Sequence, residues 1–120
     1  MSTAKFDTLS NLAGTQSVPV ATVAQGSAKA WVNFNGTGTV AIRASFNVSS
    51  ITDNGTGNYT LNFTNAMPDA NYGVSTGFQA NVGWPFAVGF LSNSTSSVQL
   101  QSYNSSTPTD TTQLVIAVFR

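Results

Sequence analysis

Alternation of apolar and polar residues at every second position is the feature that most limits how this chain can fold. The clearest example is the segment 40–48, whose alternate residues are Val40, Ile42, Ala44, Phe46 and Val48. A half-buried strand has this period of two, whereas a helix repeats its apolar residues every three or four positions. The pattern predicts a strand with these residues on one face. The alternation slips at Ser49-Ser50, which predicts a bulge or bend there.

Turn residues separate further segments with the same period. Asn54-Gly55 lies in the segment 53–58, and Asn-Gly between alternating segments is a strong hairpin signal because both residues tolerate positive φ. The return strand is predicted at 59–64. Further strands are predicted at 30–34, 72–80, 86–91, 98–103 and 113–119. No apolar period typical of a helix extends over ten residues or more.

Several short strands at this spacing predict an all-β fold, an antiparallel β-sandwich of jelly-roll-like type, at residues 29–120. Residues 1–28 are predicted to be an N-terminal arm or leader with short strands, where Pro19 excludes a central strand position. The segment 114–119 is apolar on both faces, so it is a central strand or one covered by a partner. The phenylalanines predicted to lie in the core are Phe34, Phe46, Phe63, Phe78, Phe90 and Phe119.

Charged residues make up only 7% of the chain, against about 25% in an ordinary globular protein. The formal net charge is zero, and the four scattered bases cannot neutralise a row of phosphates, which argues against nucleic-acid binding. Ser, Thr and Asn supply the polar surface instead, which suits a permanent assembly or an uncharged partner such as a sugar. There is no apolar run of about 18 residues, so no membrane insertion is expected. The first residues also lack the apolar stretch of a secretory signal.

Catalysis and metal binding are not expected, because the chain has no His, Cys or Glu. A serine nucleophile would have no imidazole as its base, which leaves only Lys5 or Lys29 for that role, and a thiolate metal site is impossible. Oxygen ligands alone leave a metal site open, but the nearest such segment, Asp53-Asn54-Gly55, is better explained as a turn. The available carboxyl groups are those of Asp7, Asp53, Asp69 and Asp110. Asp53 and Asp69 are typical turn residues, since Asp side chains bond to the nearby backbone. We therefore predict no enzyme activity, no catalytic residue, no metal and no cofactor.

Two aromatic residues outside the predicted core are candidates for ligand binding. Trp84, near Asn81, lies in a predicted loop, and Tyr103, next to Asn104, shares the outward face of its strand with two glutamines. An aromatic ring beside amides can stack on a sugar while the amides bond to its hydroxyls. Trp84 has an alternative role as a plug for one end of the sandwich, because tryptophan is highly buried on average.

Three residues are candidates for an interface between copies. Trp31 lies opposite the predicted core face of its strand, so it is either exposed or covered by a neighbouring chain. Arg43 is a charge in the middle of a strand, which is either solvated or paired at an interface. Phe119 ends the strand that is apolar on both faces. These features, together with the low charge, predict self-association.

A dense run of residues between positions 29 and 72 resembles a known module. The matching segments are KAWVNFNGTG (29–38), VAIRASFNVSSITDNGTG (40–57), YTLNF (59–63) and AMPDANY (66–72). They resemble a module of tailed-phage virion proteins, usually the distal part of tail fibres, especially in marine phages. Residues 5–9 and 16–20 resemble the leader that often precedes it. One departure is length, since tail fibres are usually much longer than 120 residues.

The resemblance implies a homotrimeric β-domain of the virion that binds rather than catalyses. The expected function is that of a fibre knob for host-receptor attachment through a surface glycan. A decoration protein with a structural role on the capsid or tail is the alternative, and a polysaccharide depolymerase is less favoured. The expected partners are further copies of the chain, other virion proteins and a host cell-surface glycan. No family site motif is available to transfer to particular residues.

Overall fold

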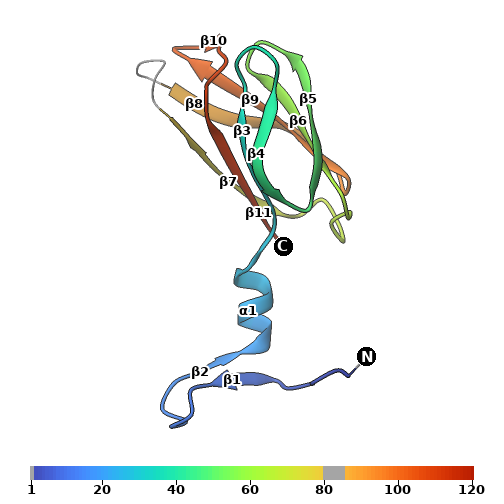
Figure 1. The fold of residues 1–120 in the computed structure, drawn as a ribbon, viewed down its shortest axis with the longest axis vertical. Helices are drawn as coiled ribbons and strands as arrows, with labels where there is room; N and C mark the ends of the chain where they lie inside the picture. The colour runs from blue at the N-terminus through green and yellow to red at the C-terminus, as the bar shows by residue number, and fades with distance from the viewer. Residues whose placement is uncertain (1, 80–85) are drawn as a thin grey trace.

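The structure, a computed structural model, describes residues 2–79 and 86–120 and is an all-β sandwich with one short helix (Figure 1). This confirms the predicted fold class. The elements are β1 (Thr8–Ser10), β2 (Ser17–Pro19), α1 (Val20–Gly26), β3 (Ala28–Asn35), β4 (Ala41–Phe46), β5 (Val48–Gly55), β6 (Asn58–Phe63), β7 (Gly73–Phe78), β8 (Phe86–Asn93), β9 (Ser97–Asn104), β10 (Thr107–Pro108) and β11 (Leu114–Phe119).

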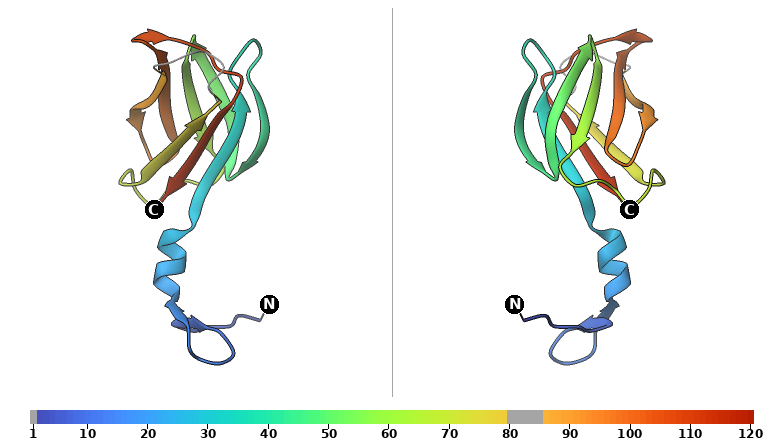
Figure 2. Two further views of the ribbon diagram at one scale, coloured as in Figure 1. Left: turned by 90° about the vertical axis from the view of Figure 1, so that its left-hand side faces the viewer. Right: turned by 90° about the vertical axis from the view of Figure 1, so that its right-hand side faces the viewer.

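Two antiparallel sheets form the layers of the sandwich (Figure 2). The four-stranded sheet has the order β4-β3-β11-β7. The five-stranded sheet has the order β10-β9-β6-β5, with β8 also paired to β9. Strands β7, β8, β9 and β11 lie close to the segments predicted from the period of two. The remaining pair, β1 and β2, forms a separate small hairpin.

The core lies between the two sheets and is built from alternate residues of their strands. Its members are Ala30, Val32, Phe34, Val48, Tyr59, Leu61, Phe63, Met67, Tyr72, Val98, Leu100, Leu114, Ile116 and Val118. Phe34 and Tyr59 meet edge to face with ring centroids 5.2 Å apart. An edge-to-face pair adds about 0.5–1.5 kcal/mol beyond the area that it buries. This contact joins β3 of one sheet to β6 of the other.

The predicted central strand is confirmed as β11, which pairs with β3 on one side and β7 on the other. Leu114, Ile116 and Val118 are buried in the core, and Val115 and Ala117 are half-buried on the opposite face. The outer face of this sheet is therefore apolar at its centre.

The prediction of a single strand over residues 40–48 with one buried face is wrong. All residues of β4 are exposed, and Val48 belongs to β5 in the other sheet. Asn47 has a φ of 55° and turns the chain from one sheet to the other. Its side-chain nitrogen donates to the carbonyl oxygens of Lys29 and Asn65, each at 3.0 Å. Asparagine tolerates this left-handed backbone better than most residues.

A bulge in β4 changes the phase of the alternation within the strand itself. Phe46 pairs with Trp31 and Ile42 pairs with Phe34, with an irregularity between these pairs. Paired residues share a face of an antiparallel sheet, so Phe46 lies on the outer face with Trp31, whereas Ile42 lies on the inner face. One extra residue in the strand is sufficient to reverse the face.

Three phenylalanines predicted to be in the core are exposed instead. Phe46 is 55% exposed, Phe90 58% and Phe119 37%. Phe46 and Phe119 lie on the outer face of the four-stranded sheet. Phe90 lies in β8 beside a register shift, in a strand that the described residues pair only with β9. The prediction holds for Phe34 and Phe63, which are buried, and Phe78 is partly buried against the core.

The hairpin predicted around Asn54-Gly55 connects β5 to β6, and the predicted bulge is present as a register shift between Val48 and Ser50. The two-residue turn, however, is Thr56-Gly57, two positions after the Asn-Gly pair. Asp53 acts as a turn residue, because its Oδ1 accepts a 2.9 Å bond from the backbone N–H of Gly55.

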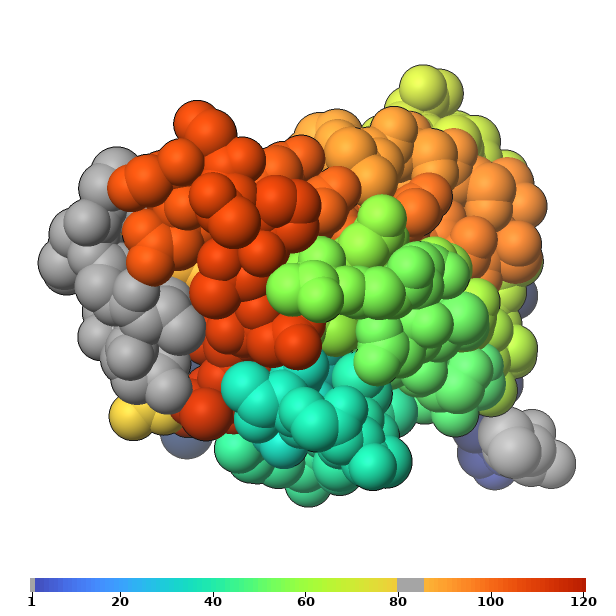
Figure 3. All heavy atoms as spheres, turned by 90° about the horizontal axis from the view of Figure 1, so that it is seen from above, coloured from blue at the N-terminus to red at the C-terminus, as the bar shows by residue number. Residues whose placement is uncertain are grey.

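A hydrogen-bonded cluster closes the end of the sandwich where the β3–β4, β5–β6 and β10–β11 connections gather (Figure 3). The Tyr59 hydroxyl lies 2.6 Å from Oδ1 of Asp110 and 2.9 Å from the carbonyl oxygen of Gly36. The N–H of Gly57 donates to the same Asp110 oxygen at 2.7 Å. Burial and the bond to Asp110 raise the pKa of Tyr59 well above its usual value. The hydroxyl is therefore protonated and remains a donor throughout the neutral range.

Candidate binding surface

The outer face of the five-stranded sheet carries a continuous set of uncharged polar side chains. Strands β5, β6 and β9 lie side by side in this sheet, so their outward residues form adjacent rows. The set comprises Ser50, Thr52, Asn54, Asn58, Thr60, Asn62, Gln99 and Gln101, and we call it the amide–hydroxyl face. Its members alternate with the buried residues of β6 and β9, which anchor them to the core.

Hydrogen bonds across strands hold these side chains in fixed positions. Asn62 donates through Nδ2 to Ser50 Oγ at 3.1 Å and to Thr52 Oγ1 at 2.9 Å. Gln99 donates through Nε2 to Asn58 Oδ1 at 2.9 Å. An amide offers two donor hydrogens and two acceptor lone pairs, so these bonds leave part of its capacity for a ligand. The result is a pre-arranged surface of donors and acceptors without charge.

Tyr103 lies at one end of this face, on the same side of β9 as Gln99 and Gln101 and half-buried. Tyr103 pairs with Ala87 of the neighbouring strand β8, and the small alanine side chain leaves space beside the tyrosine ring. A shallow, open hollow of about 330 Å³ is lined by Ala87, Tyr103 and Ser106. The sheet thus presents an aromatic side chain next to a row of amides.

The turn beside the hollow has an unusual backbone. Ser105 and Ser106 connect β9 to β10 with φ values of 48° and 72°. Two consecutive positive φ values are typical of a type I′ turn, where Asn-Gly is the preferred sequence. Residues held in this region cost about 1–3 kcal/mol each, and such strain is concentrated at functional sites. This strain lies at the same end of the sheet as the Tyr103 hollow.

The other predicted ligand-binding residues are only partly placed. Asn104 ends β9 opposite Phe86, next to the strained turn. Asn81 and Trp84 lie outside the described residues, so neither of the two roles considered for Trp84 is tested. The rows on β5 and β6 were not among the predicted site residues. The alternation in 59–64 already placed Thr60 and Asn62 on one face of their strand, and this was the available signal.

A second surface covers the outer side of the four-stranded sheet and is apolar. It comprises Trp31, Ala44, Phe46, Val115, Ala117 and Phe119, and we call it the apolar face. Trp31 is 38% exposed and lies directly opposite Phe46. The side-chain oxygen of Asn33 is buried here and has no hydrogen-bond partner among the described residues. Arg43, the third predicted interface residue, is exposed in β4.

The carboxyl groups of Asp53, Asp69 and Asp110 have structural partners. Asp69 forms a two-bond ion pair with Arg120, with Nη2 and Oδ2 2.6 Å apart and Nε and Oδ1 2.9 Å apart. It also accepts from the N–H of Asn71 at 2.8 Å, as expected for a turn residue. The bonds from Arg120 and then that from Asn71 lower the pKa of Asp69 to about 2. The described residues contain no group of three or more metal-binding side chains.

Neither the helices of the structure nor a comparison with known proteins indicates a function for these surfaces. In the part of the chain that the structure describes, no helix has the length and apolar character needed to cross a bilayer. Comparison of the chain with models of protein families, with curated proteins and with solved structures finds no match.

Proposed function

We propose that the domain is an attachment protein of a phage particle that binds an uncharged glycan of the host cell surface. The observation that carries this proposal is the amide–hydroxyl face, which ends at the Tyr103 hollow. Binding without catalysis is part of the proposal, because the carboxyl groups of Asp53, Asp69 and Asp110 are held by backbone or ion-pair partners.

The chemistry of the face suits a neutral sugar. Sugar hydroxyls both donate and accept, and side-chain amides such as Gln99 and Gln101 do the same. The Tyr103 ring offers an apolar surface for the C–H face of a sugar ring, with a polar hydroxyl at its end. No Lys, Arg, Asp or Glu belongs to the face, so a charged ligand would have no counter-ion there.

The setting in a virion and the trimeric state are supported by different features. The resemblance of residues 29–72 to a tail-fibre module supports a fibre knob. The low charge and the apolar face support permanent association with further copies of the chain. In this arrangement the apolar faces lie inside the trimer and the amide–hydroxyl faces lie outside.

A decoration protein of the capsid or tail is the second candidate. The apolar face is the observation that favours it, because that surface could also cover another virion protein. Cryo-electron microscopy of purified particles separates the two candidates: density at a fibre tip supports the knob, and density spread over the capsid or tail supports decoration.

Binding of the purified protein to host cells and to their isolated surface glycans tests the attachment function. The variants Gln99→Ala and Tyr103→Ala remove one amide and one ring, and we expect each to weaken binding about tenfold, which corresponds to 1.4 kcal/mol. Gln25→Ala removes an amide from α1, far from the face, and is the matched control. Equal binding by all variants, or no binding by the unchanged protein, would contradict the proposal.

A further inference from the structure

Residues 2–27 form an arm that stands apart from the sandwich (Figures 1 and 2). The arm consists of the β1–β2 hairpin followed by α1, and none of its residues is buried. The molecule is correspondingly elongated, with extents of 52 × 29 × 24 Å. The arm thus has no core of its own and no contact that buries it on its own domain.

Local interactions are too few to hold such an arm in shape. Its strands have three residues each and its helix has seven. An isolated two-stranded hairpin is marginally stable in water, and so is a helix shorter than about 12–15 residues. A stable arm therefore needs a surface outside itself to pack on.

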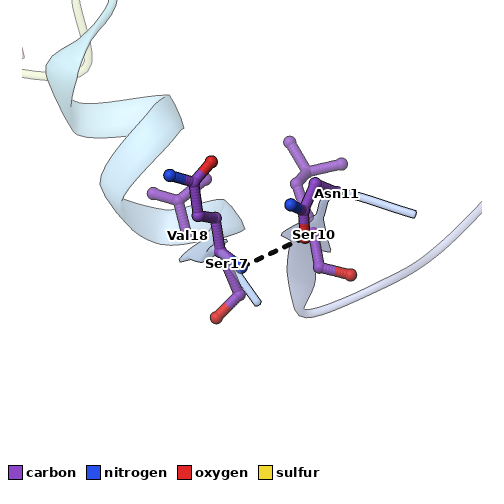
Figure 4. A pocket seen from close by; sticks show the side chains of 6 residues that line it. Ser10, Asn11, Ser17 and Val18 are labelled. Atoms are coloured by element: carbon purple, nitrogen blue, oxygen red, sulfur yellow. Dashed lines mark hydrogen bonds between the residues drawn. The ribbon is translucent and has the colours of Figure 1, made fainter. Parts of the chain in front are cut away.

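The arm also exposes apolar side chains that a partner could cover. Phe6 is 54% exposed, Leu9 40% and Val23 40%, and Leu12 is fully exposed. Leu9 pairs with Val18 across the hairpin. These two residues help to line a hollow of about 330 Å³ on the hairpin (Figure 4). A side chain from another molecule would fit into such a space.

The direction of the arm keeps it away from its own apolar face. The Lys29 ammonium group donates to the carbonyl oxygens of Ala24 and Ser27, which ties the end of α1 to the start of β3. Asn47 holds the carbonyl oxygen of Lys29 from the sandwich side. The helix therefore continues beyond the end of the sandwich, as Figure 1 shows, and does not fold back over β3 and β4.

We propose that the arm of one copy packs on the apolar face of a second copy. Each surface is apolar and unpartnered in the single chain, and both belong to the same molecule, so one contact repeated between copies would cover both. Arm exchange would also build the assembly without a disulfide, which this cysteine-free chain cannot form.

One pair of opposite charges, Asp7 in the arm and Arg43 in β4, is available between the two surfaces, and Lys5 makes the net charge of residues 2–27 zero. Arg43 is the basic residue of β4, next to the apolar face, and Asp7 is the acid of the arm. Neither has an ion-pair partner among the described residues. Asp7 holds the arm together through its backbone instead, since its carbonyl oxygen accepts a 2.8 Å bond from Val20. Its carboxylate is therefore available to meet Arg43 of the neighbouring copy.

This inference rests on the association of copies in the proposed function and is independent of glycan binding. Sedimentation of the full chain tests it with the double variant Leu9→Asp and Val23→Asp. We expect this variant to sediment as a monomer at micromolar concentrations where the unchanged protein is an oligomer. The control, Thr8→Asp with Thr22→Asp, adds the same charge to the neighbouring residues of the arm and should keep the oligomeric mass.

Three results of this comparison are decisive. A monomeric unchanged protein overturns both the arm exchange and the proposed trimer. An oligomer that survives in the Leu9/Val23 variant overturns the arm exchange alone. Equal loss of mass in the variant and its control also overturns it, because the effect then comes from charge and not from the apolar contact. The affinity of a single chain for the glycan, measured on the same variants, should be unchanged.

Cysteine crosslinking identifies the contact directly, because the chain has no native cysteine. We produce Leu9→Cys and Ala117→Cys chains together in one cell, so that mixed oligomers assemble during synthesis, and add a short bismaleimide. A crosslinked pair that contains one chain of each variant supports arm exchange. Leu9→Cys produced together with Gln101→Cys, on the opposite sheet, should give no such pair. Equal crosslinking in both mixtures, or in neither, would overturn the proposal.

Discussion

The hydroxyl group of Tyr59 lies 2.6 Å from Oδ1 of Asp110, a residue between β10 and β11. Tyr59 belongs to β6, and its ring packs against Phe34 of β3 in the other sheet. The Tyr59 side chain therefore contacts both sheets and also the segment that leads into β11. The end of the sandwich is thus closed by a specific polar contact in addition to apolar packing.

Tyr59→Phe removes this donor and keeps the ring. We expect the free energy of unfolding to fall by about 1–3 kcal/mol, because both acceptors of the hydroxyl, Asp110 and Gly36, lose a partner. Chemical denaturation measures the change. Tyr103→Phe, on the outer face, is the control and should change stability by less than about 0.5 kcal/mol. Equal effects of the two variants would show that the buried hydroxyl has no special role.

Gly36→Ala should destabilise the same contact from the other side. A Cβ atom at this position would lie 2.8 Å from Cζ of Tyr59 and even closer to its hydroxyl oxygen. We expect a loss of about 1–3 kcal/mol, the usual effect of forcing extra volume into a packed site. At Gly89 nothing lies within 4 Å of an added Cβ, so Gly89→Ala is the control. Thermal unfolding of both variants checks the difference, and an unaffected Gly36 variant would contradict the tight packing.

The ion pair between Asp69 and Arg120 should make stability depend on pH in acid. The folded-state pKa of Asp69 is about 2, below the ordinary value of 3.8. A lowered pKa stabilises the folded state above pH 3.8, and this contribution disappears as the pH falls toward 2. The melting temperature of Asp69→Asn should therefore lie below that of the unchanged protein at pH 6 and approach it at pH 2. A constant difference across this range, measured by circular dichroism, would argue against the pair.

Replacing Ser105-Ser106 by Asn-Gly should stabilise the domain. Both serines have positive φ, which Asn and Gly adopt with less strain. We expect the free energy of unfolding to rise by roughly 1 kcal/mol, the scale on which relief of a strained residue acts. Denaturation in urea measures it. The reversed pair, Gly-Asn, is a second test, because it also places residues that tolerate positive φ at both positions. A loss of stability in both variants would contradict the prediction that the two serines are strained.

The inner faces of the strands could be predicted where the alternation is uninterrupted. In β9, Val98 and Leu100 are buried and Gln99 is outward, as the period of two indicates. In β4 the same kind of pattern was misleading. The bulge and the left-handed backbone of Asn47 each involve one residue and do not change the alternation in the sequence. The sequence also does not distinguish an apolar residue that faces outward from one that faces the core.

The candidate site could be predicted in part. Tyr103 and its two glutamines were expected on one face because they alternate with buried residues of their own strand. The rows of β5 and β6 could not be joined to them in advance, because the lateral order of strands depends on pairings between distant segments. Asn58, for example, pairs with Gln101, 43 positions later in the chain.

The position of β11 has a consequence for how the domain folds. Phe34 of β3 pairs with Leu114 of β11, which follows it by 80 positions, so the four-stranded sheet cannot form until β11 is present. Closing such a long loop is entropically costly and slows folding in proteins dominated by non-local pairing. During synthesis the β3–β4 hairpin would emerge with one unpaired edge and an apolar surface. We therefore expect the yield of the domain to depend on how well that edge is protected until β11 arrives.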